Sequence, residues 1–190
     1  MTNNTHNVFS AAVAITIDHE TMGRKRDYVF DPHDPGGETH FGISARTYPH
    51  LNIKELSIEL ARGIYFADYW RAPKLDLLAD IAPDLAIKCF DLGVNCGQRT
   101  AVRFLQRAVN TVCDGDVPPE RAAAWRQSIA RLMGGKPLRV DGIIGPITLN
   151  VIRLCPHYTA LMAALKGEAY KHYAAGQALM RPGWLNRLES

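Results

Sequence analysis

The sequence predicts a mainly α-helical protein with one small β element. Apolar residues recur at helical spacing through most of the chain, and the strand-like stretches flank a single turn rich in proline and glycine. The chain has 190 residues, 47% of them hydrophobic, which is enough to bury a core without disulfides or metals. Because no repeat or long linker interrupts the pattern, any two domains must be closely packed.

The first helix and a β-hairpin are expected to follow one another. Val8, Ala12 and Ile15 fall at helical spacing, which predicts a helix over about residues 7–22. Short strand-like stretches on either side of residues 31–38 then indicate an irregular β-hairpin. The turn between them holds three carboxylates, two prolines and two glycines, although a turn needs at most one acid.

Six further helices are expected along the rest of the chain. The second should begin at Asn52, with Glu55 completing a capping box, and should run to about Trp70 before Pro73 ends it. The next helix is expected over residues 85–94, and Pro83 suits its first turn. The other four helices are expected over residues 99–112, 119–133, a stretch ending at 154, and 158–175.

Charge and cysteine content narrow the possible functions. The formal net charge is only +3 and no Lys/Arg-dense arm is present, so nucleic-acid binding gains no support. Cys89, Cys96, Cys113 and Cys155 are widely spaced, and they are expected to be free thiols in a protein made in a reducing compartment. The apolar run over residues 8–17 is too short to span a bilayer and lacks the features of a signal peptide, so no stable membrane insertion is expected.

Two carboxylic acids are candidates for acid–base chemistry. Glu20 lies in the last turn of the first helix, where the helix dipole and apolar neighbours would raise a carboxyl pKa, as a general acid requires. Glu38 follows a glycine and has no evident capping duty, whereas Asp31 and Asp34 each precede a proline and can cap the turn. Glycosidic cleavage commonly uses such a carboxyl pair. The plainer alternative is a surface Glu20 near a helix end beside a solvated turn.

Other chemistries find less support. The histidines are scattered, with no ligand pair at helical spacing, and neither a Gly-x-Ser-x-Gly elbow nor a P-loop is present. No metal site is therefore expected. Thr39 can orient a water or simply occupy a strand. Tyr28, Tyr69 and Trp70 can line a sugar-binding cleft, with core packing as the alternative for each.

The order of these residues resembles the start of glycoside hydrolase family 108, whose members are N-acetylmuramidases and in many cases phage endolysins. The resemblance rests on Glu20, on the segment 28–43 and on the segment 67–70, which ends in a Tyr-Trp pair. One departure is that several residues, among them the basic run 24–26, separate Glu20 from Tyr28, whereas the family has Glu-Gly-Gly-Tyr. The resemblance implies a lysozyme-like helical fold and no cofactor.

The second half of the chain resembles the peptidoglycan-binding region that usually follows in this family. The segments that carry this likeness are residues 91–97, 104–110, 140–148 and 183–187. The resemblance implies a muramidase region over residues 1–92 and a closely packed helical peptidoglycan-binding region over 93–190. The alternative is that the second half merely completes the helical core, with Asn95, Gln106 and Asp141 serving as turn and cap residues.

The resemblance also implies roles for individual residues. Glu20 is expected to be the general acid, with Glu38 as its partner, Asp34 in reserve and Thr39 beside them. The residues expected to contact the glycan are Tyr28, His40, Tyr69, Trp70, Asn95 and Gln106.

The sequence therefore predicts a monomeric peptidoglycan hydrolase of the endolysin type. It is expected to cleave the β-1,4 bond between N-acetylmuramic acid and N-acetylglucosamine. The expected route is synthesis in the host bacterial cytoplasm without a signal peptide, then action on the wall in the periplasm after release. Two alternatives stay open: a lytic transglycosylase with one essential glutamate, and an inactive wall-binding component of a phage particle.

Overall fold

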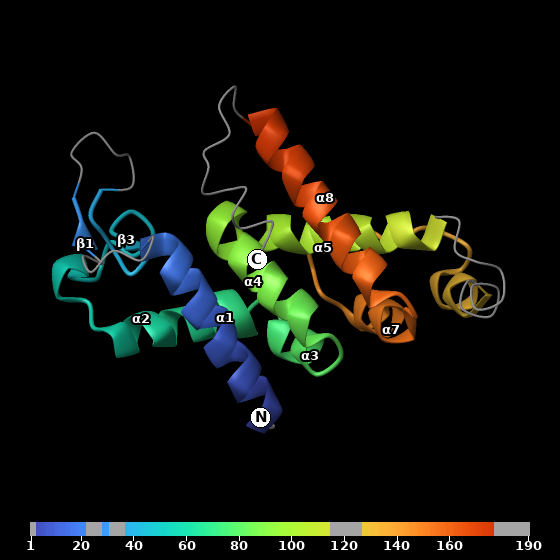
Figure 1. Cartoon of the computed structure of the whole chain (residues 1–190), viewed down its shortest axis with the longest axis horizontal. Coiled ribbons are helices and arrows are strands. Elements are labelled where there is room, and N and C mark those ends of the chain that lie inside the picture. Colours follow the sequence, from blue (N-terminus) through green and yellow to red (C-terminus); the bar gives the residue numbers. More distant parts are fainter. Residues whose placement is uncertain (1–2, 22–27, 31–36, 115–126, 177–190) are drawn as a thin grey trace.

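The computed structural model describes residues 3–21, 28–30, 37–114 and 127–176. The described part is mainly helical, with one small antiparallel sheet (Figure 1), so the predicted fold class is confirmed. The principal helices are α1 (Asn3–Thr21), α2 (Ile58–Ile64), α3 (Leu75–Ala79), α4 (Pro83–Cys96), α5 (Gln98–Asp114), α7 (Pro146–Leu154) and α8 (Tyr158–Gly176). Residues 127–133 are also helical.

Helix α4 is the centre of the core. It packs against α1, α3 and α5, and its buried residues cover nearly its whole circumference, as is typical of a helix surrounded by others. Helix α5 in turn packs against α8. The predicted boundary between residues 92 and 93 lies within α4, so any two regions of this chain share that helix.

An aromatic cluster joins α1 and α4 to the helical segment that precedes α3. The ring of Phe90 lies 6.0 Å from Phe9 and 5.8 Å from Trp70, with both pairs in edge-to-face geometry. Phe9 also lies 5.5 Å from Trp70. Such ring pairs contribute stability beyond their buried area, so this cluster fixes the position of α1 relative to the rest of the fold.

The sheet is larger than the predicted hairpin by one strand. Strand β2 (Thr39–His40) pairs with β1 (Tyr28–Val29) on one side and with β3 (Ile43–Ser44) on the other. The two-residue turn between β2 and β3 has positive φ at both positions, 50° at Phe41 and 77° at Gly42, which matches a type I′ hairpin. The Tyr65 hydroxyl donates to the carbonyl oxygen of Phe41 at 2.8 Å, and this contact holds the unusual turn against the helical core.

The long helix predicted from Asn52 is interrupted, and the predicted capping box is wrong. A 3₁₀ turn, η1, spans Ile53–Glu55, and Asn52 makes no side-chain cap hydrogen bond. The chain is then extended at Ser57, whose hydroxyl accepts from the backbone N–H of Leu60 and so caps α2.

A π-helical segment, η2 (Tyr65–Arg71), continues directly from α2. Its widened geometry shows in the backbone N–H of Ala72, which donates to the carbonyl oxygen of Ala67 at 3.0 Å, five residues earlier. Pro73 follows its end, as expected. The short helix α3 was not predicted, because it has only five residues and lies within the nine that separate Pro73 from Pro83.

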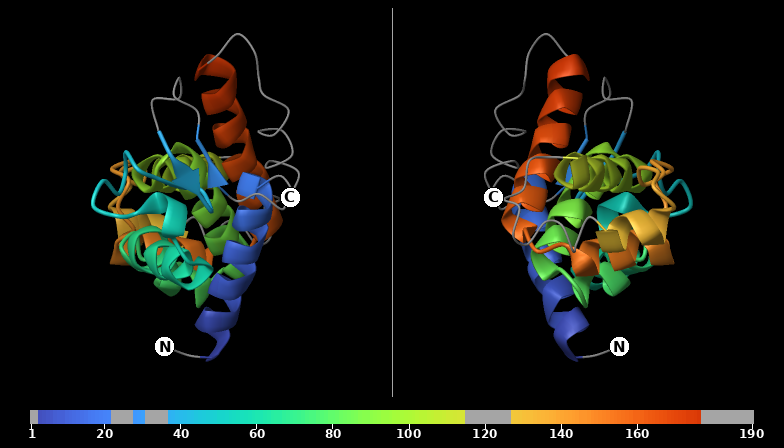
Figure 2. Two further views of the ribbon diagram at one scale, coloured as in Figure 1. Left: turned by 90° about the vertical axis from the view of Figure 1, so that its left-hand side faces the viewer. Right: turned by 90° about the vertical axis from the view of Figure 1, so that its right-hand side faces the viewer.

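Residues 138–145 form a segment that packs on α5 before α7 begins. Figure 2 shows α1 and this segment on opposite sides of the molecule. A Cβ atom on Gly142 would lie 2.7 Å from the carbonyl oxygen of Arg99, so the backbone here approaches α5 more closely than any side chain permits.

Two expectations about chemistry outside the site can also be compared with the structure. All four cysteines are described and all are free thiols, as expected; burial raises the pKa of the Cys89 thiol to about 12, which makes it unreactive. Within the described ranges, no helix is both long and apolar enough to cross a membrane.

Candidate active site

Glu20 lies in the last turn of α1, and this end of α1 lies beside the small sheet (Figures 1 and 2). The preceding turns anchor the helix, because Ala12, Val13 and Thr16 are almost completely buried. The C-terminal end of α1 therefore lies near the sheet whose strand β2 directly follows Glu38. The carboxyl group of Glu20 lies outside the described part of the chain, as do Asp31 and Asp34.

Glu38 is half-buried immediately before β2 and is held by two contacts. Its carbonyl oxygen accepts a hydrogen bond from the backbone N–H of Ala45 at 2.8 Å. Its carboxylate accepts one from the hydroxyl of Tyr28. Desolvation, together with this hydrogen bond, raises the pKa of Tyr28, so the hydroxyl stays protonated and remains a donor. A donor fixed on the neighbouring strand orients the Glu38 carboxylate.

Tyr28 and His40 complete a polar group around Glu38. They are directly opposite each other in the register of β1 and β2, with ring centroids 5.8 Å apart. Side chains alternate between the two faces of a strand, so Glu38 and His40 share a face with Tyr28. By the same alternation, Thr39 points to the other face of the sheet.

His40 is oriented by two further contacts. Its Nδ1 lies 3.0 Å from the carbonyl oxygen of Ile53, and its ring stacks on Phe41 at 4.1 Å. Because a carbonyl oxygen only accepts hydrogen bonds, Nδ1 must carry a proton, which leaves Nε2 as the atom available to a ligand. His40 is thus both a structural link to η1 and a candidate substrate contact.

A second polar group consists of Asp68 and Tyr69 on η2 together with Tyr48. The Tyr48 hydroxyl donates to Oδ2 of Asp68 at 2.8 Å. Burial, the hydrogen bond to Asp68 and another to Tyr69 raise the pKa of Tyr48. Tyr69 is half-buried and packs edge-on against Tyr65 at 5.5 Å, so part of its ring stays accessible. Sequence reasoning missed Tyr48, which carries no local signal that could have found it.

The prediction that Trp70 contacts the substrate is wrong. Its side chain has 0% exposure and packs among the rings of Phe9 and Phe90. Adjacent positions on a helical segment point in different directions, so Tyr69 and Trp70 do not both reach the surface. Trp70 is a core residue, which was the stated alternative.

This correction leads to a stability prediction. We expect Trp70→Ala to lower the free energy of unfolding by about 3–5 kcal/mol, because it removes the largest of the fully buried side chains that the structure describes and leaves a cavity. Tyr69→Ala, in the adjacent half-buried position, should cost clearly less. Denaturant unfolding of the two variants provides the measurement, and equal losses would contradict the assignment of Trp70 to the core.

The prediction that Gln106 contacts the glycan is also wrong. Gln106 is 1% exposed. Its Nε2 donates to Oδ1 of Asp141 at 2.9 Å and to the carbonyl oxygen of Ile143 at 3.1 Å, while its Oε1 accepts from the backbone N–H of Gly142 at 2.8 Å. The hydrogen bond from Gln106 is the main cause that lowers the pKa of Asp141. Gln106 and Asp141 are therefore turn-holding residues, again the stated alternative.

Removing this buried amide should loosen the segment that packs on α5. We expect Gln106→Ala to lower the free energy of unfolding by about 3 kcal/mol, because three hydrogen bonds are lost and buried polar groups are left without partners. Gln98→Ala serves as the control, since Gln98 makes a single longer hydrogen bond, to the carbonyl oxygen of Asp68 at 3.3 Å. A loss no larger than that of the control would contradict this account.

Two other expectations concern Asn95 and metals. Asn95 is half-buried in the last turn of α4, and its substrate contact stays a prediction. Among the residues the structure describes, no group of three or more histidine, cysteine, aspartate or glutamate side chains is placed to hold a metal ion.

The N-terminal half of the chain matches a known protein family. Residues 13–97 match the family model described as glycosyl hydrolase 108, and this range contains Glu20, Tyr28, Glu38 and His40. This match over nearly half of the chain supports a glycoside hydrolase. No curated protein matches the chain.

The whole fold has a counterpart among solved structures. The chain is similar to the structure of Brucella abortus SagA, with a TM-score of 0.68 and 22% sequence identity, over 97% of this chain and 91% of the SagA chain. At this identity the likeness supports the fold alone. It extends over both halves of the chain and accords with the lysozyme-like helical fold that was expected.

Proposed function

We propose that this glycoside hydrolase is an N-acetylmuramidase that cleaves the β-1,4 bond between N-acetylmuramic acid and N-acetylglucosamine in peptidoglycan. The observation that carries the proposal is the glycosyl hydrolase 108 match over residues 13–97. Within this range, the end of α1 that bears Glu20 lies beside the sheet on which Tyr28 orients Glu38.

In this proposal, Glu20 protonates the leaving glycosidic oxygen. Glu38 activates the attacking water or stabilises the positive charge that develops on the sugar ring. Asp34 is the reserve candidate for this second role. A carboxyl separation of about 6.5–9.5 Å would indicate attack by water with inversion, whereas about 5–5.5 Å would indicate a covalent intermediate. The Tyr28 hydroxyl keeps the Glu38 carboxylate in one orientation through either route.

The glycan strand would lie across the sheet and η2. Nε2 of His40 and the partly exposed ring of Tyr69 are the contacts that the described residues offer, because a sugar ring presents both hydroxyl groups and an apolar face. Asn95 at the end of α4 remains a further candidate. Thr39 would have to act from the opposite face of β2, so its part in orienting a water is the weakest element of the proposal.

We assign wall binding to residues 93–190, working as a monomer together with the catalytic region. This part packs closely on the rest through α4 and α5, so the two regions would approach the wall as one body. The proposed setting is that of an endolysin, made in the host bacterial cytoplasm and acting on the wall in the periplasm after release.

The test of the proposed function is the release of soluble fragments from purified peptidoglycan by the full chain. We expect the turbidity of a wall suspension to fall and new sugar ends to appear in the supernatant. Sedimentation of the protein with the wall, without any release of fragments, would instead support the alternative of an inactive wall-binding component.

A further inference from the structure

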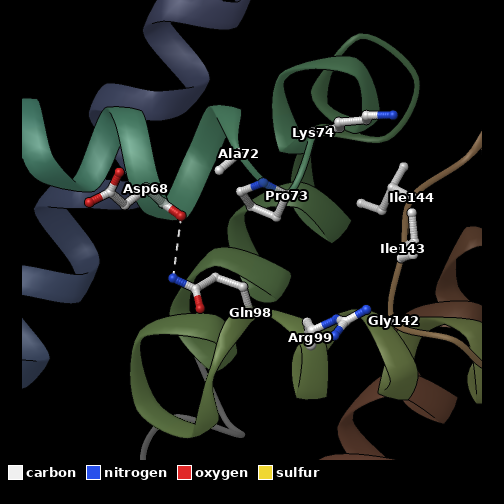
Figure 3. A pocket seen from close by; sticks show the side chains of 9 residues that line it. All are labelled: Asp68, Ala72, Pro73, Lys74, Gln98, Arg99, Gly142, Ile143 and Ile144. Atoms are coloured by element: carbon white, nitrogen blue, oxygen red, sulfur yellow. Dashed lines mark hydrogen bonds between the residues drawn. The ribbon is translucent and has the colours of Figure 1, made fainter. Parts of the chain in front are cut away.

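A cavity of about 320 Å³ lies where three segments far apart in sequence meet (Figure 3). One wall is the end of η2 with the turn that follows it, the second is the start of α5, and the third is residues 142–144. None of the candidate catalytic residues lines it. Asp68 joins the cavity to the proposed glycan surface, because its carboxylate bonds to Tyr48, which also bonds to Tyr69.

The backbone around the cavity is held in unusual conformations. Lys74 has a left-handed backbone, with φ of 65° and ψ of 35°, which is uncommon for a residue other than glycine. Its N–H donates to the carbonyl oxygen of Arg71 at 2.9 Å, and the next residue, Leu75, is buried. On the facing wall, Gly142 touches the backbone of α5. Such backbone outliers concentrate at functional sites.

The cavity carries a net positive charge. Lys74 and Arg99 are both exposed, and neither forms an ion pair with another described residue. The acid of the lining, Asp68, directs its carboxylate away from both cations in Figure 3 and bonds to Tyr48 instead. Two unpaired cations at the rim of a cavity favour a ligand with carboxylate groups.

Apolar groups form the remainder of the lining. Ala72, Pro73 and Ile144 contribute short hydrocarbon surfaces, and Ile143 is 51% exposed although it is large and apolar. A fitting ligand therefore combines carboxylates with small alkyl groups. Acidic peptides that contain alanine have this composition.

We propose that this cavity binds the peptide stem of peptidoglycan, an inference that rests on the proposed muramidase function. The stem is a short acidic peptide that branches from the muramic acid residue, and its alanine methyl groups suit the apolar wall. A glycan held against Tyr69 would project a stem past Asp68 toward Lys74 and Arg99. The enzyme would thus favour strands that still carry their peptides.

The test compares two substrates with a double variant, Lys74→Asn with Arg99→Gln. Asparagine removes the charge and tolerates the left-handed backbone. On intact peptidoglycan we expect KM to rise about five- to tenfold, as the loss of two exposed ion pairs allows, with kcat unchanged. On glycan strands stripped of their stems by an amidase, KM should equal that of the unaltered protein.

Arg62→Gln is the matched control, because it removes an exposed arginine on α2, away from the cavity; its kinetics should be unchanged on both substrates. An unaltered KM of the double variant on intact peptidoglycan would overturn the proposal. An equal rise on both substrates would overturn it as well, since the cations would then serve the glycan itself. If the unaltered protein cleaves neither substrate, the proposed function fails, and the assignment of this cavity falls with it.

Discussion

Replacing Glu20 by glutamine is expected to lower kcat on purified peptidoglycan by about 10³-fold, because proton transfer by a positioned side chain contributes roughly 10²–10⁴-fold to such a reaction. Glutamine has the same shape as glutamate but cannot protonate the leaving oxygen. Residue 20 lies in the last turn of α1, whose preceding turns are anchored in the core, so the fold should not depend on this carboxyl group.

Asp18→Asn is the matched control for Glu20→Gln. It removes a carboxyl group two positions earlier on the same helix and should leave turnover close to that of the unaltered protein. Thermal unfolding of both variants establishes that they are folded. Wall-degrading activity retained by Glu20→Gln would refute its role as the general acid.

Replacing Glu38 by glutamine should have the second-largest effect, a fall in kcat of about 10²-fold. The amide oxygen of glutamine can still accept the hydrogen bond from the Tyr28 hydroxyl, so the side chain keeps its orientation and loses only its negative charge. Turnover at saturating substrate measures this effect separately from binding.

Two comparison variants distinguish the possible partners of Glu20. Asp34→Asn should leave most of the activity, because Asp34 precedes a proline and is expected to cap its turn. Tyr28→Phe should give a smaller fall than Glu38→Gln, since it frees the carboxylate without removing its charge. If Asp34→Asn costs more than Glu38→Gln, the second catalytic role belongs to Asp34.

The helices that the sequence predicted well share one physical property. Helices α4, α5, α7 and α8 begin near a proline or glycine and carry regular apolar spacing, so local signals and burial agree. The segment 52–71 shows where such signals fail. Leu56 is buried although its backbone is extended rather than helical. In η2 the π-helical geometry changes the spacing of residues that share a face, and the types of residue in this segment do not reveal that change.

In the candidate site, too, sequence could identify some residues and not others. Tyr28, Glu38 and His40 could be found from sequence because they lie within a few residues of one unusual turn, and the structure places them together. The roles of Trp70 and Gln106 could not be predicted from their neighbours in sequence. Whether an aromatic ring faces the core depends on its neighbours in space, here Phe9 and Phe90, and the partners of Gln106 come from a turn 35–37 residues further along the chain.

The most direct test of the account is mass spectrometry of the sugar ends that the full chain releases from purified peptidoglycan. Hydrolysis between N-acetylmuramic acid and N-acetylglucosamine predicts fragments that end in a reducing N-acetylmuramic acid. Fragments lighter by one water, with an anhydro end, would identify a lytic transglycosylase. Fragments that end in a reducing N-acetylglucosamine would show cleavage of the other glycosidic bond, and either result would contradict the account.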